Sequence, residues 1–205
     1  MDRRFNIWLF VAVVVAFPIS VYAVVNWYEK TVQALPVMIS KTHTIDDYQL
    51  INQLGKESST KNWGSKIVVA NFFFTHCPSV CPKMTNNLKK VEQANKENKN
   101  LLFISFSVDP ERDSSAQLQK FAQRFKIDAR HWQLLTGSKK QIYRLARNSF
   151  QVVATDGDGG ENDFIHSDQL ILIDTQKRIR GYYNGTEEKE IAQLIKDIKK
   201  LEHEN

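Results

Sequence analysis

Cys77 and Cys81 are the only cysteines of the 205-residue chain, and they stand four positions apart. The apolar run 67–74 before them predicts a buried strand, and the stretch 83–94 after them predicts a helix. One helical turn would bring both sulfurs to one face with their Cα atoms about 6 Å apart, which permits a disulfide without requiring one. Because a helix N-terminus stabilises a thiolate, the pair is suited to nucleophilic or metal-binding chemistry.

A metal held by these two thiolates needs a further ligand. Two sulfurs favour copper(I), with zinc as the generic competitor, but they leave most coordination geometries incomplete. His166 is the leading third ligand, because it precedes a predicted hairpin strand where thioredoxin-like proteins normally place a cis-proline, and no proline follows Pro110. Cys77, Cys81 and His166 would form a site suited to copper in either oxidation state.

The other four histidines are weaker candidates. His76 adjoins Cys77, but neighbouring side chains in an extended turn tend to point apart, so we expect it to be at most an auxiliary ligand. His43 and His203 are expected at the surface, and His131 is expected to be packed or exposed rather than to bind metal.

The stretch 156–163 is rich in glycine and acidic residues. It does not fit an EF-hand, because Gly160 occupies the third ligand position and no glutamate stands where the loop should close. We interpret it as a mobile loop that carries His166 and could move this ligand in and out of the site.

An uncharged apolar segment, 7–25, precedes the rest of the chain. As a helix it would span about 28 Å, close to the hydrocarbon thickness of a bilayer. Arg3 and Arg4 precede it, so the positive-inside rule predicts a cytoplasmic N-terminus at 1–6, a transmembrane anchor at 7–25 and an extracytoplasmic remainder. A cleaved signal peptide ending at Ala23 is the alternative.

The remainder of the chain divides into a tether at 26–42 and one domain at 43–205, which is long enough to enclose a core. The net charge of +5 comes from lysines scattered among acids at helical spacing. This pattern indicates a solvated surface and argues against nucleic-acid binding.

Hydrophobic periodicity and turn signals predict the elements of this domain. We expect strands over 43–50, 63–74, 101–108, 169–174 and 178–183, and helices over 83–94 and from Ser114, Ser138 and Thr186. This order predicts an α/β thioredoxin-like sandwich, in which helices flank a central mixed sheet.

The chain resembles the Sco (SenC-type) family of membrane-anchored copper chaperones for cytochrome c oxidase. The resemblance rests on 72–82 (FFFTHCPSVCP), 107–113 (SVDPERD) and His166. It implies that Cys77, Cys81 and His166 bind copper(I), with copper(II) as a second state, and that the recipient is the dinuclear copper site of oxidase subunit II. It also implies a location in the bacterial inner membrane, with other copper chaperones as further candidate partners.

Two positions differ from the pattern of many relatives. Ser79 stands between the cysteines where an acid is common, and Ile165 directly precedes the histidine where an acid is also common. Both differences remove negative charge near the metal but leave the ligands in place. The loop 109–112 would lie beside the site, and we interpret it as a salt-bridged turn.

The main alternative function is a thiol-disulfide reductase that keeps the cysteines of the oxidase subunit reduced. His166 favours metal binding, because a reductase has no need of it. A peroxiredoxin-like peroxidase is excluded, because it needs Thr or Ser three residues before the reactive cysteine, where Phe74 and Pro78 stand. A structural zinc site or disulfide is a further alternative.

Overall fold

The computed structural model describes residues 10–32, 34–40, 42–152 and 167–204. His166, the stretch 156–163 and the first nine residues lie outside these ranges. The chain divides into an N-terminal unit, Met1–Leu35, and a compact unit, Pro36–His203.

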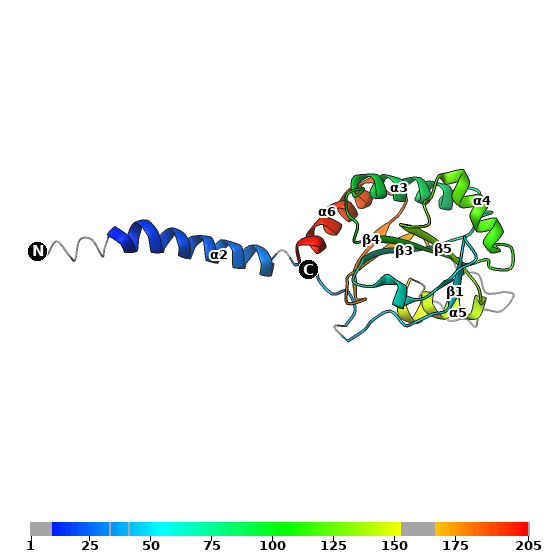
Figure 1. Cartoon of the computed structure of the whole chain (residues 1–205), viewed down its shortest axis with the longest axis horizontal. Coiled ribbons are helices and arrows are strands. Elements are labelled where there is room, and N and C mark those ends of the chain that lie inside the picture. Colours follow the sequence, from blue (N-terminus) through cyan, green and yellow to red (C-terminus); the bar gives the residue numbers. More distant parts are fainter. Residues whose placement is uncertain (1–9, 33, 41, 153–166, 205) are drawn as a thin grey trace, which may run out of the picture. The chain divides into compact units, whose positions relative to one another are not determined.

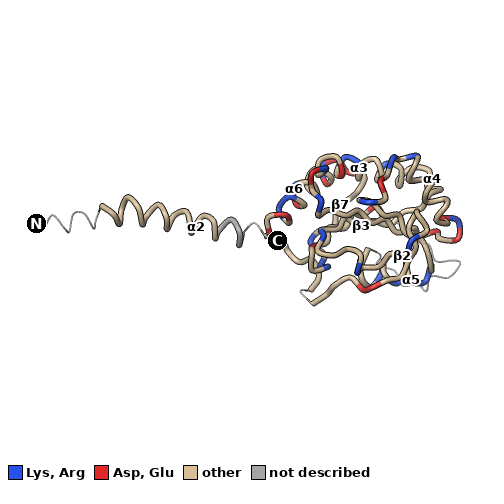
Figure 2. The backbone as a smooth tube through the Cα atoms, in the orientation of Figure 1, with Lys and Arg blue, Asp and Glu red and all other residues tan. Residues whose placement is uncertain are grey.

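The N-terminal unit is helical. A π-helical stretch, η1 (Ala12–Ala16), continues into helix α2 (Phe17–Val32). Figure 2 shows no Lys, Arg, Asp or Glu on the tan part of this helix, and large apolar side chains such as Phe10, Phe17 and Tyr22 are exposed. Among the described residues, no helix combines the length and the apolar character needed to cross a membrane. The transmembrane helix at 7–25 therefore stays a prediction.

The described part of the compact unit is built on one seven-stranded sheet with the strand order β2-β1-β5-β4-β3-β6-β7. Strands β3, β4 and β5 run parallel, and their neighbours on both sides pair antiparallel, so the predicted mixed sheet is confirmed. The strand bounds are β1 (Leu50–Asn52), β2 (Glu57–Ser58), β3 (Ile67–Phe73), β4 (Leu101–Ser107), β5 (Trp132–Thr136), β6 (Gln169–Ile173) and β7 (Ile179–Asn184).

Helices cover both faces of the sheet (Figure 1). Helices α3 (Val80–Ala94), α4 (Ser115–Phe125) and α6 (Glu188–Glu204) lie on one face, and α5 (Lys139–Arg144) lies on the other. The π-helical stretch η3 (Leu145–Ser149) extends α5. Every residue of β3 and β4 is buried, as expected for strands covered on two sides.

Aromatic rings fill the core on the α5 side of the sheet. The ring of Phe106 lies 5.2 Å from that of Phe72, 5.2 Å from that of Phe150 and 5.4 Å from that of Tyr48. Phe72 and Phe106 come from β3 and β4, and Phe150 follows η3, so the cluster fixes the segment after η3 against the two central strands.

Serine hydroxyl groups start two of the predicted helices. Ser114 accepts a hydrogen bond from the backbone N–H of Gln117, and Ser138 accepts one from that of Gln141. These N-caps satisfy backbone donors that have no partner inside the helix, so α4 and α5 begin where the sequence predicts.

The predicted strand over 43–50 is wrong, because the first strand begins only at Leu50. A side chain, not a neighbouring strand, binds the backbone here. The Asp47 carboxylate accepts hydrogen bonds from the N–H of Tyr48 and from the N–H and hydroxyl of Thr60. The predicted strand over 63–74 begins at Ile67, because Ser59 caps a 3-10 helix, η2 (Thr60–Trp63), ahead of it. Strand β5 was not predicted.

The start of the compact unit contacts the β6–β7 hairpin. The N–H of Met38 donates to the carbonyl of Ile179 at 3.0 Å, and the guanidinium of Arg180 donates to the carbonyl of Pro36 at 3.2 Å. Farther on, the N–H of Ile45 donates to the carbonyl of Lys177 at 3.1 Å. One bond to the start of β7, one to the β6–β7 turn and one from the Arg180 side chain therefore hold these residues against the hairpin.

Candidate functional site

The two cysteines lie where the central strand β3 passes into helix α3, at the carboxyl ends of the parallel strands. Because β3 and β4 are parallel, the turn after β3 and the loop after β4 emerge side by side at this end of the strands. The N–H of Cys77 donates to the carbonyl of Phe74 at 3.3 Å, which folds the chain back toward α3. Helix α3 starts at Val80, so Cys81 lies in its first turn.

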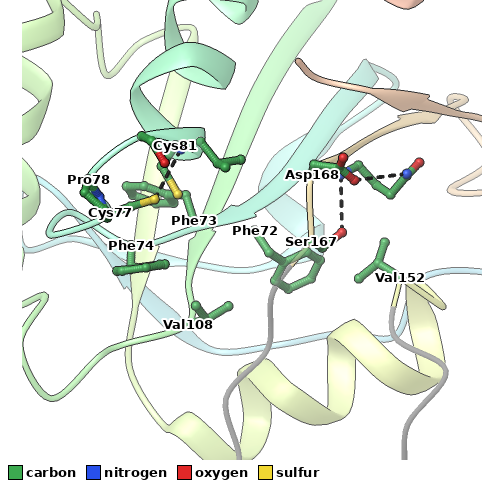
Figure 3. Close-up of a pocket in the computed structure, with 13 residues that line it drawn as sticks. Phe72, Phe73, Phe74, Cys77, Pro78, Cys81, Val108, Val152, Ser167 and Asp168 are labelled. Carbon is green, nitrogen blue, oxygen red and sulfur yellow. Dashed lines mark hydrogen bonds between the residues drawn. The ribbon is translucent and has the colours of Figure 1, made fainter. Parts of the chain in front are cut away.

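The two sulfurs face one another across this turn (Figure 3). Both thiols are free, and the backbone N–H of Cys81 donates to the sulfur of Cys77 at 3.3 Å. Cys77 is partly exposed, whereas Cys81 is only 6% exposed. The structure therefore confirms the predicted proximity of the pair and adds a difference in accessibility.

The environment of Cys77 favours its thiolate. Partial burial alone would raise the pKa of this thiol, but the backbone N–H groups of Cys81, Ser79 and Val80 and the thiol of Cys81 together outweigh burial. The pKa of Cys77 is therefore lower than that of an ordinary cysteine. This arrangement is the expected effect of donors at a helix N-terminus.

The environment of Cys81 has the opposite effect. Burial raises the pKa of Cys81 to about 12, and the hydrogen bond to Cys77 and the charges of Cys77 and Asp113 act in the same direction. A negative charge on this buried sulfur is unfavourable unless a bound cation neutralises the charge or the sulfur forms a new covalent bond.

A cavity of about 550 Å³ lies beside the pair. Its walls come from the end of β3, the cysteine turn, and the residues on either side of the undescribed stretch, Val152 and Ser167 (Figure 3). Asp168 lies on the side of the cavity away from the cysteines (Figure 3), and Gln169 also lines it. His166 itself lies outside the described residues, so its role as third ligand stays a prediction, although Ser167, the next residue, lines the cavity.

The remaining histidines are not gathered around the sulfurs. His43 contacts the backbone carbonyl of Ser149 at 2.8 Å through Nε2, and His131 and His203 are exposed, as expected. His76 is exposed and does not line the cavity. Within the described ranges, no group of three or more His, Cys, Asp or Glu side chains could hold a metal ion.

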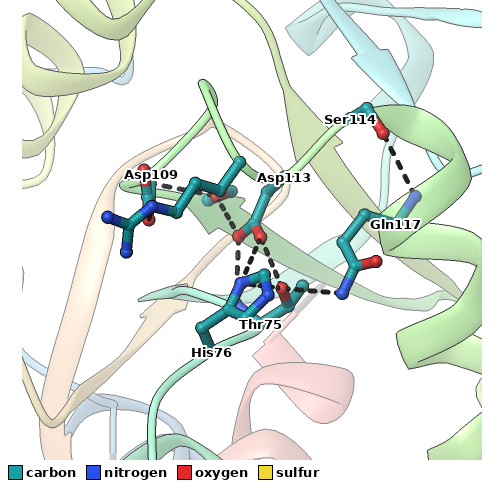
Figure 4. Close-up of polar contacts among 8 residues, drawn as sticks. Thr75, His76, Asp109, Asp113, Ser114 and Gln117 are labelled. Atoms are coloured by element: carbon teal, nitrogen blue, oxygen red, sulfur yellow. Dashed lines mark hydrogen bonds and ion pairs between the residues drawn. The ribbon is translucent and has the colours of Figure 1, made fainter.

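A buried carboxylate behind the cysteine turn escaped the sequence analysis. Asp113 is 0% exposed and accepts hydrogen bonds from the N–H and hydroxyl of Thr75 and from the hydroxyl of Ser107 (Figure 4). It thereby joins the chain after β3 to the end of β4. Hydroxyl residues at corresponding ends of two parallel strands, followed by an acid in the next loop, were the signal that could have revealed it.

The loop that carries Asp113 is the turn expected at 109–112. Its backbone closes through a hydrogen bond from the N–H of Arg112 to the carbonyl of Asp109 at 3.1 Å. The guanidinium of Arg112 also lies 3.8 Å from the Asp109 carboxylate. The interpretation as a salt-bridged turn is therefore confirmed.

Comparison with known proteins gives a consistent result. A family model for SCO1/SenC matches residues 37–203. The SCO1 protein homolog of Bacillus subtilis is 33% identical over 159 residues, which cover 77% of this chain and 82% of that protein.

Two solved structures share the fold. BsSco, described as a member of the Sco family of cytochrome c oxidase assembly proteins with a disulfide switch, is 30% identical with a TM-score of 0.71, over 84% of this chain and 99% of that one. Bradyrhizobium japonicum ScoI, solved with copper bound, is 27% identical with a TM-score of 0.62, over 77% of this chain and 99% of that one.

Proposed function

Because this chain belongs to the SCO1/SenC family, we propose that it binds copper and delivers it to the dinuclear copper site of cytochrome c oxidase subunit II. The observation that carries the proposal is the pair of free, facing thiols at the wall of an open cavity. The relative ScoI holds copper, and BsSco belongs to a family of oxidase assembly proteins.

The donor chemistry of the site fits copper(I) as a cargo. Two thiolate sulfurs are the soft ligands that copper(I) prefers, and Cys77 is disposed to be a thiolate. Cys81 must release its proton to the solvent when it binds the metal, so copper binding is coupled to proton release. We propose His166 as the nitrogen ligand, since Ser167 brings the chain to the cavity wall.

Copper binding can be tested on the full chain in detergent solution. Reduced protein is loaded with copper(I), freed of excess metal and analysed for copper, with the exposed His131→Ala as the control. We expect Cys77→Ser to lose the metal. His166→Ala should weaken binding by at least about tenfold, because even the loss of a group that only hydrogen-bonds to a metal ligand lowers metal affinity by about that factor. An unmutated protein that retains no copper would contradict the proposal.

We further propose that 7–25 anchors the domain in the bacterial inner membrane, with 1–6 in the cytoplasm and 43–205 outside. The absence of charge over this segment and the exposed apolar side chains of its described part support an anchor. Detergent, but not alkaline carbonate, should release the chain from membranes. A mature N-terminus after Ala23 would show instead that the segment is a cleaved signal.

The second candidate function is reduction of disulfides in the oxidase subunit. The contrast between an accessible thiolate at Cys77 and a buried thiol at Cys81 supports it, and BsSco is described as having a disulfide switch. Cys77 would attack the partner disulfide and release one partner thiolate; Cys81 would then close the Cys77–Cys81 disulfide and release the other. Two electrons pass to the partner, and Cys81 gives up one proton.

The two functions can be separated by one variant. If reduction is the main activity, His166→Ala should reduce a disulfide-bonded subunit II domain as fast as the unmutated protein. If copper delivery dominates, the same variant should fail to metallate the reduced subunit. An unmutated protein that reduces the disulfide but does not metallate the reduced subunit would favour the reductase, whereas equal metallation by both proteins would remove His166 from the copper site.

A further inference from the structure

A chain of hydrogen bonds runs from the interior to the exposed ring of His76 (Figure 4). The hydroxyl of Thr75 donates to Oδ1 of Asp113 at 2.5 Å and lies 3.1 Å from Nδ1 of His76. The side-chain amide of Gln117 donates to the same hydroxyl at 3.2 Å. The Thr75 oxygen therefore contacts three polar partners at once.

The valence of a hydroxyl group fixes the role of each partner. Such a group has one hydrogen to donate and two lone pairs to accept with. The hydrogen of Thr75 goes to Asp113 and one lone pair accepts from Gln117, so the remaining lone pair must accept from His76. Nδ1 of His76 therefore carries the hydrogen.

The position of the Asp113 carboxylate supports the same assignment. Its Oδ1 lies 3.8 Å from Nδ1 of His76, and the Thr75 hydroxyl oxygen lies 3.1 Å from the same nitrogen. Both oxygens can accept a hydrogen bond from this nitrogen, and neither has a hydrogen left to donate to it. In a neutral imidazole with Nδ1–H, the lone pair resides on Nε2. Because the His76 side chain is 54% exposed, this lone pair is available outside the cavity.

A metal-binding histidine in a protein almost always donates its other ring N–H to a carboxylate, a carbonyl or a water, which fixes its tautomer and orientation. His76 has this arrangement already in place, through the Thr75 hydroxyl to a fully buried carboxylate. Cys77, the next residue, is the more accessible of the two thiols. The two cysteines therefore line the cavity, and the His76 nitrogen lies outside its lining, next in the sequence to the accessible thiol.

We propose that His76 is a transfer ligand: its Nε2 takes up copper(I) at the surface while the ion passes between the cysteine pair and an external acceptor. This inference rests on the proposed copper-binding function. In the step, a bond from copper to one thiolate sulfur breaks as a bond to Nε2 forms. Copper stays copper(I) throughout the step.

Asp113 and Thr75 are positioning residues in this scheme. Asp113 holds the hydroxyl of Thr75, which in turn holds Nδ1–H of the imidazole. Thr75→Val keeps the shape of the side chain but removes the hydroxyl, whereas Thr75→Ser keeps the hydroxyl. The pair separates the hydrogen-bonding role from the packing role.

The tautomer can be measured without any metal. Nitrogen-15 spectra of the full chain in detergent, at about pH 8 where an ordinary imidazole is neutral, distinguish a protonated from a bare ring nitrogen. We expect Nδ1–H and a bare Nε2 in the unmutated protein and in Thr75→Ser, and a mixture of tautomers in Thr75→Val. A proton on Nε2 of the unmutated protein would overturn the inference.

The transfer role is tested by the rate at which copper(I)-loaded protein gives its metal to the chelator bathocuproine disulfonate. His76→Ala should retain the same amount of copper as the unmutated protein but release it about tenfold more slowly. His131→Ala is the matched control, since this exposed histidine precedes β5, at the edge of the sheet opposite the cysteine turn.

The outcomes of the two experiments are distinguishable. Equal release rates for His76→Ala and His131→Ala would overturn the transfer role while the proposed function stands. Loss of bound copper in His76→Ala would make His76 a ligand of the resting site, which also contradicts the inference. An unmutated protein without copper would contradict the proposed function, and the nitrogen-15 spectra would still decide the tautomer.

Discussion

Burial and backbone donors make Cys77 and Cys81 unequal, although the two residues are chemically identical. Cys77 receives N–H groups at the start of α3, whereas Cys81 turns its sulfur into the protein. Cys77 is therefore disposed to react as a thiolate, whereas Cys81 keeps its proton until a metal ion or a disulfide bond replaces it.

Alkylation should reveal this difference. We expect iodoacetamide to modify Cys77 with a pH midpoint below that of an unperturbed cysteine, because the folded structure lowers its pKa. Mass spectrometry of Cys81→Ser and Cys77→Ser assigns the modified site. Reaction at Cys81 before Cys77 in the folded protein would show that the assignment is reversed.

The stability of the protein should also depend on the Cys81 proton. The pKa of this thiol is raised, so the folded state binds the proton more tightly than the unfolded chain does. Its contribution is complete below about pH 9 and is lost as the pH rises toward 12. Urea unfolding should show a smaller alkaline loss for Cys81→Ser than for the unmutated protein, whereas identical pH profiles would contradict this.

Asp113 offers a third residue-scale test. Oδ2 of Asp113 accepts from the Thr75 N–H and the Ser107 hydroxyl, and Oδ1 accepts from the Thr75 hydroxyl, so whichever oxygen an amide nitrogen replaces, at least one donor loses its acceptor. We expect Asp113→Asn to lower the free energy of unfolding by about 1–3 kcal/mol. Asp128→Asn, which breaks an exposed pair with Arg130, should cost less than about 1 kcal/mol.

At the scale of elements, the aromatic cluster holds the segment after η3 on the sheet. Phe150 is 0% exposed and contacts the rings of Phe72 and Phe106. We expect Phe150→Ala to lower the free energy of unfolding by about 3–5 kcal/mol in chemical denaturation. Phe125→Ala, at a half-buried site on α4, should cost less.

The elements that sequence alone predicts are those whose pattern is set locally. The apolar runs of β3 and β4, the serine caps of α4 and α5, and the β6–β7 hairpin all agree with the structure. Strand β5 (Trp132–Thr136) was missed because its pairing partners, β4 and β1, lie far away in the chain, whereas the equally short β6 pairs with β7 across a hairpin turn.

The same distinction applies to the site. The four-residue spacing of Cys77 and Cys81 was enough to predict that their sulfurs meet. The contact between Thr75 and Asp113 depends on strands β3 and β4 ending side by side, which the spacing of the residues does not encode. Likewise, the unequal burial of the thiols follows from how α3 packs on the sheet.

At the scale of the whole molecule, the segment 36–45 belongs to the compact unit. Arg180 is 6% exposed and donates to the Pro36 carbonyl, while Met38 pairs with Ile179. We expect a chain that starts at 43 to unfold with a free energy about 1–3 kcal/mol lower than one that starts at 36. Equal stability of the two chains in urea would show that the segment contributes nothing.

The same segment has a consequence for self-association. An uncovered strand at the end of a sheet is a template on which other chains can pair, and this is a route to amyloid. Here Met38 bonds to Ile179, the first residue of β7, and the strand at the other end of the sheet, β2, has only two residues. Within the described residues, β2 therefore offers a second chain too little backbone for a long strand pairing, and Met38 occupies the start of β7 at the other end.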